Sequence, residues 1–211
     1  MAIFYHIWFP GSDDPRRDGI LRIFDEQMNH LYHSGLTRVM REMFIGVSGE
    51  FFDLMVVASR INLSQVEVFL NREGNGELPT LKRLQTWAKE HPGWNVLYLH
   101  AKGSSYDDQH MAHNWRRCMM RACVDRWRDC VQHLNEGAKL AGSHWLTKRK
   151  YPYIGDTPYF GGNFWWARTD YLNTLPDIDI HAGRFEAEVW VGKGGNPMAV
   201  DLAPHFPMTQ C

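Results

Sequence analysis

Strand-like and helix-like segments alternate along the first half of the chain, and this alternation constrains the fold more than any other feature. The periodicity predicts strands at 3–9, 43–47, 66–70 and 94–100 and helices at 19–33 and 78–88, while 51–60 fits either type. Turn-forming residues separate these segments, as in Pro-Gly-Ser-Asp-Asp-Pro after the first strand. This order predicts an α/β fold with right-handed crossovers and a mostly parallel sheet covered by helices on both faces.

The second half of the chain continues the pattern less regularly. Residues 107–134 predict a long helical stretch that breaks once, 139–145 and 162–167 predict two more strands, and 184–191 predicts a final helix. Ligands of such sheets bind beyond the carboxyl ends of the strands. The loops that follow the strands are therefore the expected places for chemistry.

The composition is that of a globular protein whose length suits one domain. The 211 residues are 44% hydrophobic and 22% charged, which excludes a disordered or fibrous chain. The formal net charge of -1 provides no global field for phosphate polymers or anionic membranes, although a local basic patch stays open. The apolar start is too short for a signal peptide and no apolar run approaches about 18 residues, so a cytoplasmic location is expected.

The four cysteines point to no metal or redox motif. Cys118, Cys123, Cys130 and Cys211 contain no CxxC pair and no Cys/His cluster with zinc spacing. Reduced, mostly buried thiols are the expectation, and they indicate a reducing compartment.

The end of the strand at 94–100 carries the first candidate site. His100 and Lys102 are followed by Gly103 and Ser104, which places an imidazole, an ammonium and a hydroxyl around a flexible backbone position. Such groups can bind the phosphates of a pyrophosphate. The alternative is a solvated turn with no ligand.

A second candidate is the aromatic segment 159–168. It contains a glycine pair, Asn163 and several large rings, and strand alternation sends Trp165 and Trp166 to opposite faces of the sheet. If one ring lines a cleft, a ring beside an amide suits a sugar or a nucleoside. An aromatic core strand explains the same residues equally well.

A third candidate lies in the final predicted helix. Glu186 and Glu188 are two residues apart and therefore do not share a helix face, so only one of them points easily into a site. A carboxylate in an aromatic cleft is a reasonable general base. Solvent exposure or a pair with Arg184 is the alternative.

These segments, in this order, resemble a group of small bacterial and viral glycosyltransferases of the GT-A type. The resemblance covers about residues 94–192 and rests on HAKG (100–103), Trp115-Arg116, GSHW (142–145), GGNFWWAR (161–168) and RFEAEVW (184–190). It implies a GT-A-like, Rossmann-type single domain over 1–211. Residues 1–106 would form a nucleotide-binding half and 107–211 an acceptor and catalytic half.

The resemblance implies transfer of a sugar from a nucleotide-diphosphate sugar, most simply a UDP-sugar, to an acceptor hydroxyl. The expected donor-binding residues are Trp8, Pro10, Gly11, His100, Lys102, Gly103, Ser104 and Asn163. The expected acceptor or sugar contacts are Tyr106, Trp115, Arg116, Trp165 and Trp166. Glu188 is the expected base, with Glu186 as its substitute; this implies inversion, while retention stays open.

One departure from the wider GT-A pattern concerns the metal. Most such enzymes end the equivalent strand in Asp-x-Asp, which holds a divalent ion, whereas this chain reads His100-Ala-Lys102 there. The sequence therefore favours transfer without a metal. Asp177 and Asp179, with His181 nearby, are the weaker alternative for a metal site.

Two other functions compete with glycosyl transfer. One is a non-catalytic sugar- or nucleotide-binding module that keeps the aromatic cleft. The other is a nucleic-acid-binding accessory protein that uses an arginine-rich helix face, formed by Arg116, Arg117, Arg121, Arg126 and Arg128. A solvated face explains these arginines as well, and a glycan, a protein side chain or a modified DNA base would all serve as acceptor.

Overall fold

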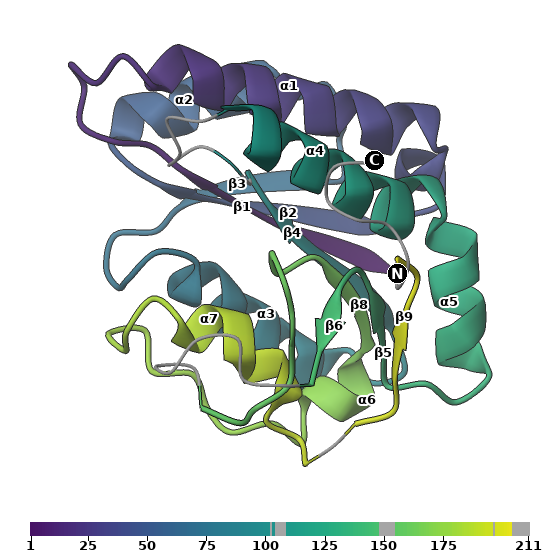
Figure 1. Ribbon diagram of the computed structural model, residues 1–211. Helices are drawn as coiled ribbons and strands as arrows, with labels where there is room; N and C mark the ends of the chain where they lie inside the picture. The colour runs from purple at the N-terminus through teal and green to yellow at the C-terminus, as the bar shows by residue number, and fades with distance from the viewer. Residues whose placement is uncertain (102, 104–108, 148–154, 196, 204–211) are drawn as a thin grey trace.

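The computed structural model describes residues 1–101, 103, 109–147, 155–195 and 197–203 (Figure 1). The strands are β1 (Ala2–Trp8), β2 (Glu42–Ser48), β3 (Val66–Leu70), β4 (Asn95–His100), β5 (Leu140–Gly142), β6 (Trp145–Leu146), β7 (Tyr159–Phe160), β8 (Trp165–Arg168) and β9 (Ala199–Asp201). The α-helices are α1 (Arg17–His33), α2 (Phe51–Ser59), α3 (Leu78–Glu90), α4 (Gln109–Met120), α5 (Trp127–Asn135), α6 (Thr169–Leu172) and α7 (Glu186–Val189). Two short 3₁₀ turns, η1 (Leu36–Arg38) and η3 (Trp190–Gly192), and a π-helical segment, η2 (Arg121–Asp125), complete the assignment.

The centre of the molecule is a seven-stranded sheet in the order β3-β2-β1-β4-β8-β5-β9. The pairs among β3, β2, β1 and β4 are all parallel, and β5 also runs parallel to β9. β8 runs antiparallel to both of its neighbours, β4 and β5. β6 and β7 form a separate two-stranded sheet. The predicted class, a mostly parallel sheet flanked by helices, is confirmed.

Helices cover both faces of the sheet, and β1 shows how the sequence produces this. Ile3, Tyr5 and Ile7 enter one core, which is closed by α1, α4 and α5, whereas Ala2 and Phe4 enter the other, which is closed by α3, α6 and α7 (Figure 1). Both faces of the strand are buried, as expected for parallel strands between two helical layers. β1 is therefore almost continuously apolar.

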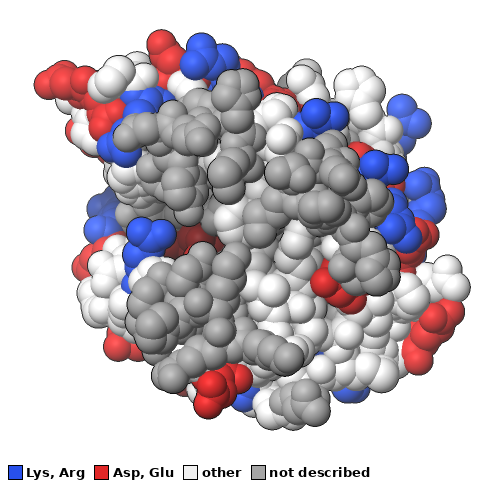
Figure 2. Space-filling view, viewed as in Figure 1, with Lys and Arg blue, Asp and Glu red and all other residues white. Residues whose placement is uncertain are grey.

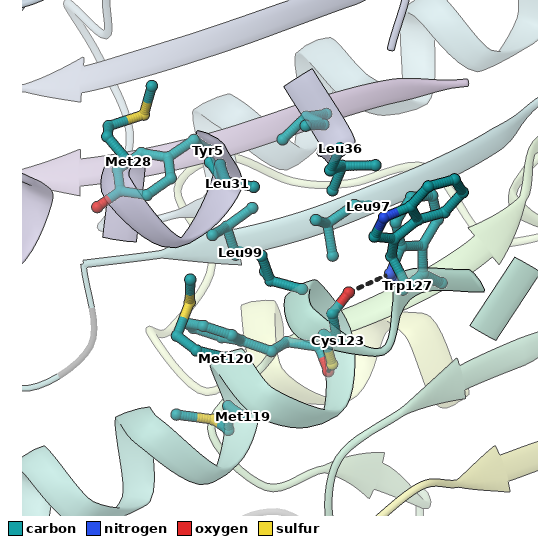
Figure 3. Close-up of a cluster of buried hydrophobic side chains, with 14 of the residues drawn as sticks. Tyr5, Met28, Leu31, Leu36, Leu97, Leu99, Met119, Met120, Cys123 and Trp127 are labelled. Carbon is teal, nitrogen blue, oxygen red and sulfur yellow. Dashed lines mark hydrogen bonds between the residues drawn. The ribbon is translucent and has the colours of Figure 1, made fainter. Parts of the chain in front are cut away.

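The core under α1 is built from long, flexible and aromatic side chains. Figure 3 shows Tyr5 and Leu99 of the sheet lying between Met28 of α1 and Met120 at the end of α4, with Trp127 closing the far side. The Tyr5 hydroxyl donates to the Gln27 side chain at 2.6 Å, so its buried polar atom is satisfied. This packing fixes α1 and α4 against the sheet.

The structure departs from the sequence-based expectations at several places. The break in the long helix is the π-helical turn η2, β9 was not predicted, and β8 is antiparallel. A π-turn inserts an extra residue into the helix, and this changes which side chains face the core afterwards. Nothing in the apolar periodicity identifies strand direction, so β8 could not be oriented from sequence.

The cysteines differ in state. Cys123 and Cys130 are free and buried, and burial raises the pKa of both thiols, that of Cys130 to about 12. Cys118 is disulfide-bonded, so the prediction of reduced thiols throughout is wrong at this residue. The spacing of cysteines along a helix does not indicate whether each of them has a disulfide partner. Among the described residues, no helix is both long enough and apolar enough to cross a membrane.

Candidate active site

Two histidines lie side by side where β1 and β4 end. His6 and His100 are register partners in the parallel pair of β1 and β4. Each lies two residues after a side chain that enters the core under α3, Phe4 in β1 and Tyr98 in β4, and therefore on the same face of the sheet. Both rings therefore face the N-terminal end of α3. The carboxyl edge of the sheet thus carries paired imidazoles on one face, at the edge where ligands of such sheets bind.

Glu77, the residue before α3, links β4 to the turn before β8 at this edge. Its Oε2 accepts hydrogen bonds from the Tyr98 hydroxyl and from Asn163 Nδ2, both at 2.8 Å, and its Oε1 lies 3.4 Å from His100 Nδ1. A carboxylate at a helix N-terminus is stabilised by the helix dipole. Sequence analysis missed Glu77, although an acidic residue directly before a Leu-Pro-Thr helix start was the available signal.

His100 is held between two acceptors. Its Nε2 donates to the Gly162 carbonyl at 2.9 Å, and its Nδ1 faces the Glu77 carboxylate. The ring is therefore fixed in orientation, and it connects the end of β4 to the turn before β8. The predicted diphosphate-binding histidine is thus a half-buried, oriented group with its ring nitrogens already engaged.

His6 is the more unusual histidine of the pair. The ring is 3% exposed, Nδ1 lies 2.9 Å from the Thr80 hydroxyl, and no described group forms a hydrogen bond with Nε2. Burial lowers the pKa of His6 to about 4, with a smaller opposing effect from Glu77, so the ring is neutral at pH 7. A buried nitrogen with no protein partner is a position where water or a ligand atom would bind. Sequence analysis did not identify His6.

The turn 161–163 brings the second half of the chain onto this edge. Gly162 has φ +91°, and a Cβ there would overlap Met119 of α4, so only glycine allows this close approach. Asn163 is 1% exposed and left-handed; its Nδ2 also donates to the Ala187 carbonyl at 3.2 Å, and its Oδ1 accepts from Trp165 Nε1 at 2.7 Å. Every polar atom of the amide is used, so Asn163 positions other groups and does not contact a sugar itself.

The loop after β1 is anchored beside the same edge. Trp8 is half-buried and lies under the guanidinium of Arg16, at 5.7 Å, and the Pro10 carbonyl accepts from Arg17 Nη1 at 2.8 Å. Arg17 also forms an ion pair with the buried Asp53 at the start of α2. Gly11 is exposed with open space around it.

A buried arginine supports the loop after β4. Arg116 is 4% exposed, pairs with Glu26 of α1 at 2.9 Å and lies under Gly103, where a Cβ would be 3.0 Å from its Nη1. The prediction that Arg116 belongs to an exposed arginine-rich helix face is wrong, because α4 turns this residue inward. Its role as an acceptor contact stays a prediction. Its charge is placed instead beneath the expected phosphate-binding loop. Trp115 lies against the 161–163 turn, where a Cβ on Gly162 would be 3.2 Å from its ring.

The two candidate carboxylates of α7 have different environments. Glu186 pairs with Lys193, whereas Glu188 is half-buried and follows Ala187, whose carbonyl is bound by Asn163. α7 also packs on α3. Figure 2 shows a recess with acidic atoms at its floor on the side where β1 and β4 end, above the position of α7 in Figure 1.

The aromatic segment does not line a cleft. Trp165 and Trp166 point to opposite faces as predicted, but both are 0% exposed, and Trp166 Nε1 donates to the Cys123 carbonyl at 2.7 Å. The expectation that one ring contacts a sugar is wrong because helices cover both faces of β8. Lys102, Ser104 and Tyr106, predicted for the donor and acceptor sites, lie outside the described residues.

The described residues do not offer a metal site. No three His, Cys, Asp or Glu side chains among them gather at metal-binding distances. Asp177 faces Lys82 and Lys89, and the Asp179 carboxylate accepts from the His181 amide at 2.9 Å, so the weaker alternative metal site does not form.

Solved structures align with this chain at low sequence identity. HddC from Yersinia pseudotuberculosis is 9% identical and aligns over 95% of this chain and 88% of its own, with a TM-score of 0.54, which shows a common fold. A protein from Desulfovibrio desulfuricans G20, described provisionally as a nucleotide-diphospho-sugar transferase, is 12% identical and covers 96% and 79%, with a TM-score of 0.49. A 4-diphosphocytidyl-2C-methyl-D-erythritol synthase is 13% identical and covers 99% and 92%, with a TM-score of 0.46.

No curated protein matches the chain. A family model matches residues 4–199, which is nearly the whole of the described structure. The chain therefore belongs to the DUF8361 family, a domain of unknown function.

Proposed function

We propose that the protein transfers a sugar from a nucleotide-diphosphate sugar to an acceptor hydroxyl. The observation that carries this proposal is the junction at Glu77, where the end of β4, the turn before β8 and the start of α7 are joined through His100 and Asn163. An enzyme that joins a donor to an acceptor needs groups from both halves of the chain at one edge. Residues 1–106 would bind the donor and 107–211 would supply the base and the acceptor contacts.

The donor would lie across the carboxyl ends of β1 and β4. In this proposal the loop with Trp8, Pro10 and Gly11 holds the nucleoside, since it offers a partly exposed ring and an open backbone position. The diphosphate lies over the loop after β4, near Gly103 and the buried Arg116. The guanidinium below the loop would stabilise the charge of the leaving diphosphate.

The chemical step is a single displacement. The acceptor oxygen attacks the anomeric carbon and gives its proton to Glu188, while the bond from that carbon to the diphosphate oxygen breaks and its electron pair leaves with the nucleoside diphosphate. Attack from the face opposite to the leaving group gives inversion. Glu188 is the base in this proposal because the resemblance implies that role for it, with Glu186 as its substitute.

The sequence His100-Ala-Lys102 at the end of β4 has no acidic residue to hold a metal, and it favours a mechanism in which protein side chains stabilise the diphosphate. Turnover measured with a chelator and with added Mn²⁺ tests this part. Activity that a chelator abolishes and Mn²⁺ restores would contradict it.

The first experiment is a thermal-shift screen against UDP-, GDP- and ADP-sugars, each with and without Mn²⁺. A donor present at one hundred times its dissociation constant should stabilise the fold by about 2.7 kcal/mol. The absence of a shift with every donor would contradict the proposal.

The second experiment separates an enzyme from a binding module. Glu188→Gln should lower turnover by roughly 10²- to 10⁴-fold and leave donor affinity nearly unchanged, because it removes the base and keeps the shape of the side chain. Glu186→Gln is the matched control and should retain most of the turnover. Equal activity of both variants would favour the non-catalytic alternative or another base.

A further inference from the structure

A pocket far from the candidate active site is lined by arginines and apolar side chains. Its volume is ≈ 690 Å³, and it lies where the C-terminal end of α1 meets η1 and α5. The lining residues are Tyr32, His33, Ser34, Gly35, Thr37, Arg38, Leu63 and Arg128. α1 separates the two sites: its first residue, Arg17, anchors the loop after β1, and its 17 residues span about 25 Å.

The lining is positively charged and contains no acid. Neither Arg38 nor Arg128 forms an ion pair with any described residue, and both are exposed. The neighbouring Arg126, in contrast, is neutralised by Asp129 at 2.8 Å. Figure 2 shows Lys and Arg atoms gathered on the side of the molecule where Figure 1 places the end of α4 and α5. Unneutralised guanidiniums in a concave surface attract anions.

Arg128 is held in place before any ligand arrives. Its guanidinium lies over the Trp127 ring at 4.4 Å, and Trp127 Nε1 in turn donates to the Ser34 carbonyl at 3.2 Å. The stacked arginine is thereby connected to the turn that forms the opposite wall. A cation that is already oriented loses less conformational entropy when it binds an anion.

The C-terminal end of α1 would normally repel an anion, because its last carbonyls carry partial negative charge. Here these carbonyls already have donors. The His33 ring binds the Asn29 carbonyl at 2.7 Å, the Ser34 amide and hydroxyl bind those of His30 and Leu31 at 2.9 and 3.1 Å, and the Gly35 amide binds that of Tyr32 at 3.1 Å. The local capping offsets the helix-end potential that faces the pocket.

We propose that this pocket binds a small phosphomonoester with an aromatic or apolar body. Each guanidinium offers a fork of donors that matches phosphate oxygens, and the two positive charges together balance a dianion. Tyr32 and Leu63 supply the apolar part of the lining, and the volume is within the usual range for small-molecule sites. The proposal stands on this pocket alone and does not depend on glycosyl transfer.

Titration calorimetry with phenyl phosphate tests the proposal. The wild-type protein should bind phenyl phosphate more tightly than inorganic phosphate, because the ring adds apolar contact. Arg38→Gln and Arg128→Gln should each weaken binding by about tenfold or more, since each removes charge-assisted hydrogen bonds. Arg38→Lys should lie between the wild type and Arg38→Gln, because it keeps the charge but not the fork.

Arg117→Gln is the matched control, since Arg117 is an exposed arginine of neighbouring α4 and does not line the pocket. It should bind phenyl phosphate as the wild type does. No binding by the wild-type protein, or equal affinity in all variants, would overturn the proposal. The Tm of each variant shows whether a loss of binding comes from loss of the fold.

A short duplex oligonucleotide without terminal phosphates separates a small-molecule site from a nucleic-acid surface. If the duplex binds through Arg38 and Arg128 while phenyl phosphate does not, the pocket belongs to a nucleic-acid surface and the proposal fails. Donor binding at the sheet edge is independent of these outcomes. The thermal-shift screen with nucleotide sugars, repeated on Arg38→Gln, should match the wild type.

Discussion

The aromatic segment 159–168 and the sheet edge at His6, Glu77 and His100 make an instructive contrast. In the first, large rings are fully buried, and the indole nitrogens of Trp165 and Trp166 are bound by the protein itself. In the second, ionisable side chains collect at strand ends, and one buried ring nitrogen has no partner among the described groups. The density of aromatic residues identifies the core of this protein, whereas ionisable groups in register on neighbouring strands identify the candidate site.

The largest expected effect on stability is in the buried aromatic segment 159–168. Trp166→Ala should lower the free energy of unfolding by about 3 to 5 kcal/mol, because it leaves a cavity and an unpaired Cys123 carbonyl. Urea denaturation measures this value. Phe52→Ala, at a ring that is 67% exposed, is the control and should change stability by less than about 0.5 kcal/mol. Similar small losses in both variants would show that the aromatic segment is not core.

A smaller effect is expected from the charge state of His6. Its pKa is about 4 in the folded protein against 6.5 as the ordinary value, so the unfolded chain binds more protons between these values. The stability contributed by neutral His6 is therefore complete above pH 6.5 and is lost as the pH falls to about 4. The shift corresponds to an upper limit of about 3 kcal/mol.

Unfolding free energies measured at the two ends of this pH window test the His6 prediction. His6→Asn cannot titrate there and keeps a polar atom near Thr80. The difference between wild type and variant isolates His6 from the other histidines. Equal pH dependence of the two proteins would mean that His6 titrates normally and that the edge is open to water.

The smallest of the three effects concerns the junction. Glu77→Gln should cost about 1 to 3 kcal/mol in unfolding free energy, because it weakens charge-assisted bonds to Tyr98 and Asn163. Glu67→Gln is the matched control: Glu67 pairs with Arg83 on the surface, so its loss should cost less than about 1 kcal/mol. If the two substitutions cost the same, Glu77 does not organise the edge.

Much of the fold follows from the sequence because its strands are buried on both faces. The apolar run of β1 and the helical spacing of α1 and α3 identify these elements almost to their ends. β9 has only three residues and obtains its pairing from β5, so nothing local distinguishes it. The direction of β8 is likewise decided by tertiary pairing.

The candidate site is less accessible from sequence. His100 was identified because it ends a clear strand, and His6 has the same phase in β1 and carries the same signal. Glu77 acquires its role only when α3 folds back against β4, and Asn163 is buried because α7 covers it. Alternation correctly separates Trp165 from Trp166, but it cannot tell whether each face meets solvent or a helix.

Hydrogen–deuterium exchange with UDP-, GDP- and ADP-glucose in turn tests the central claim most directly, because it reports which backbone segments a donor covers. We predict slower exchange at 8–17, 71–77 and 98–101 with at least one donor, and unchanged exchange at 31–38, which belongs to the distant pocket. Unchanged exchange at the sheet edge with every donor, or protection confined to 31–38, would contradict the account.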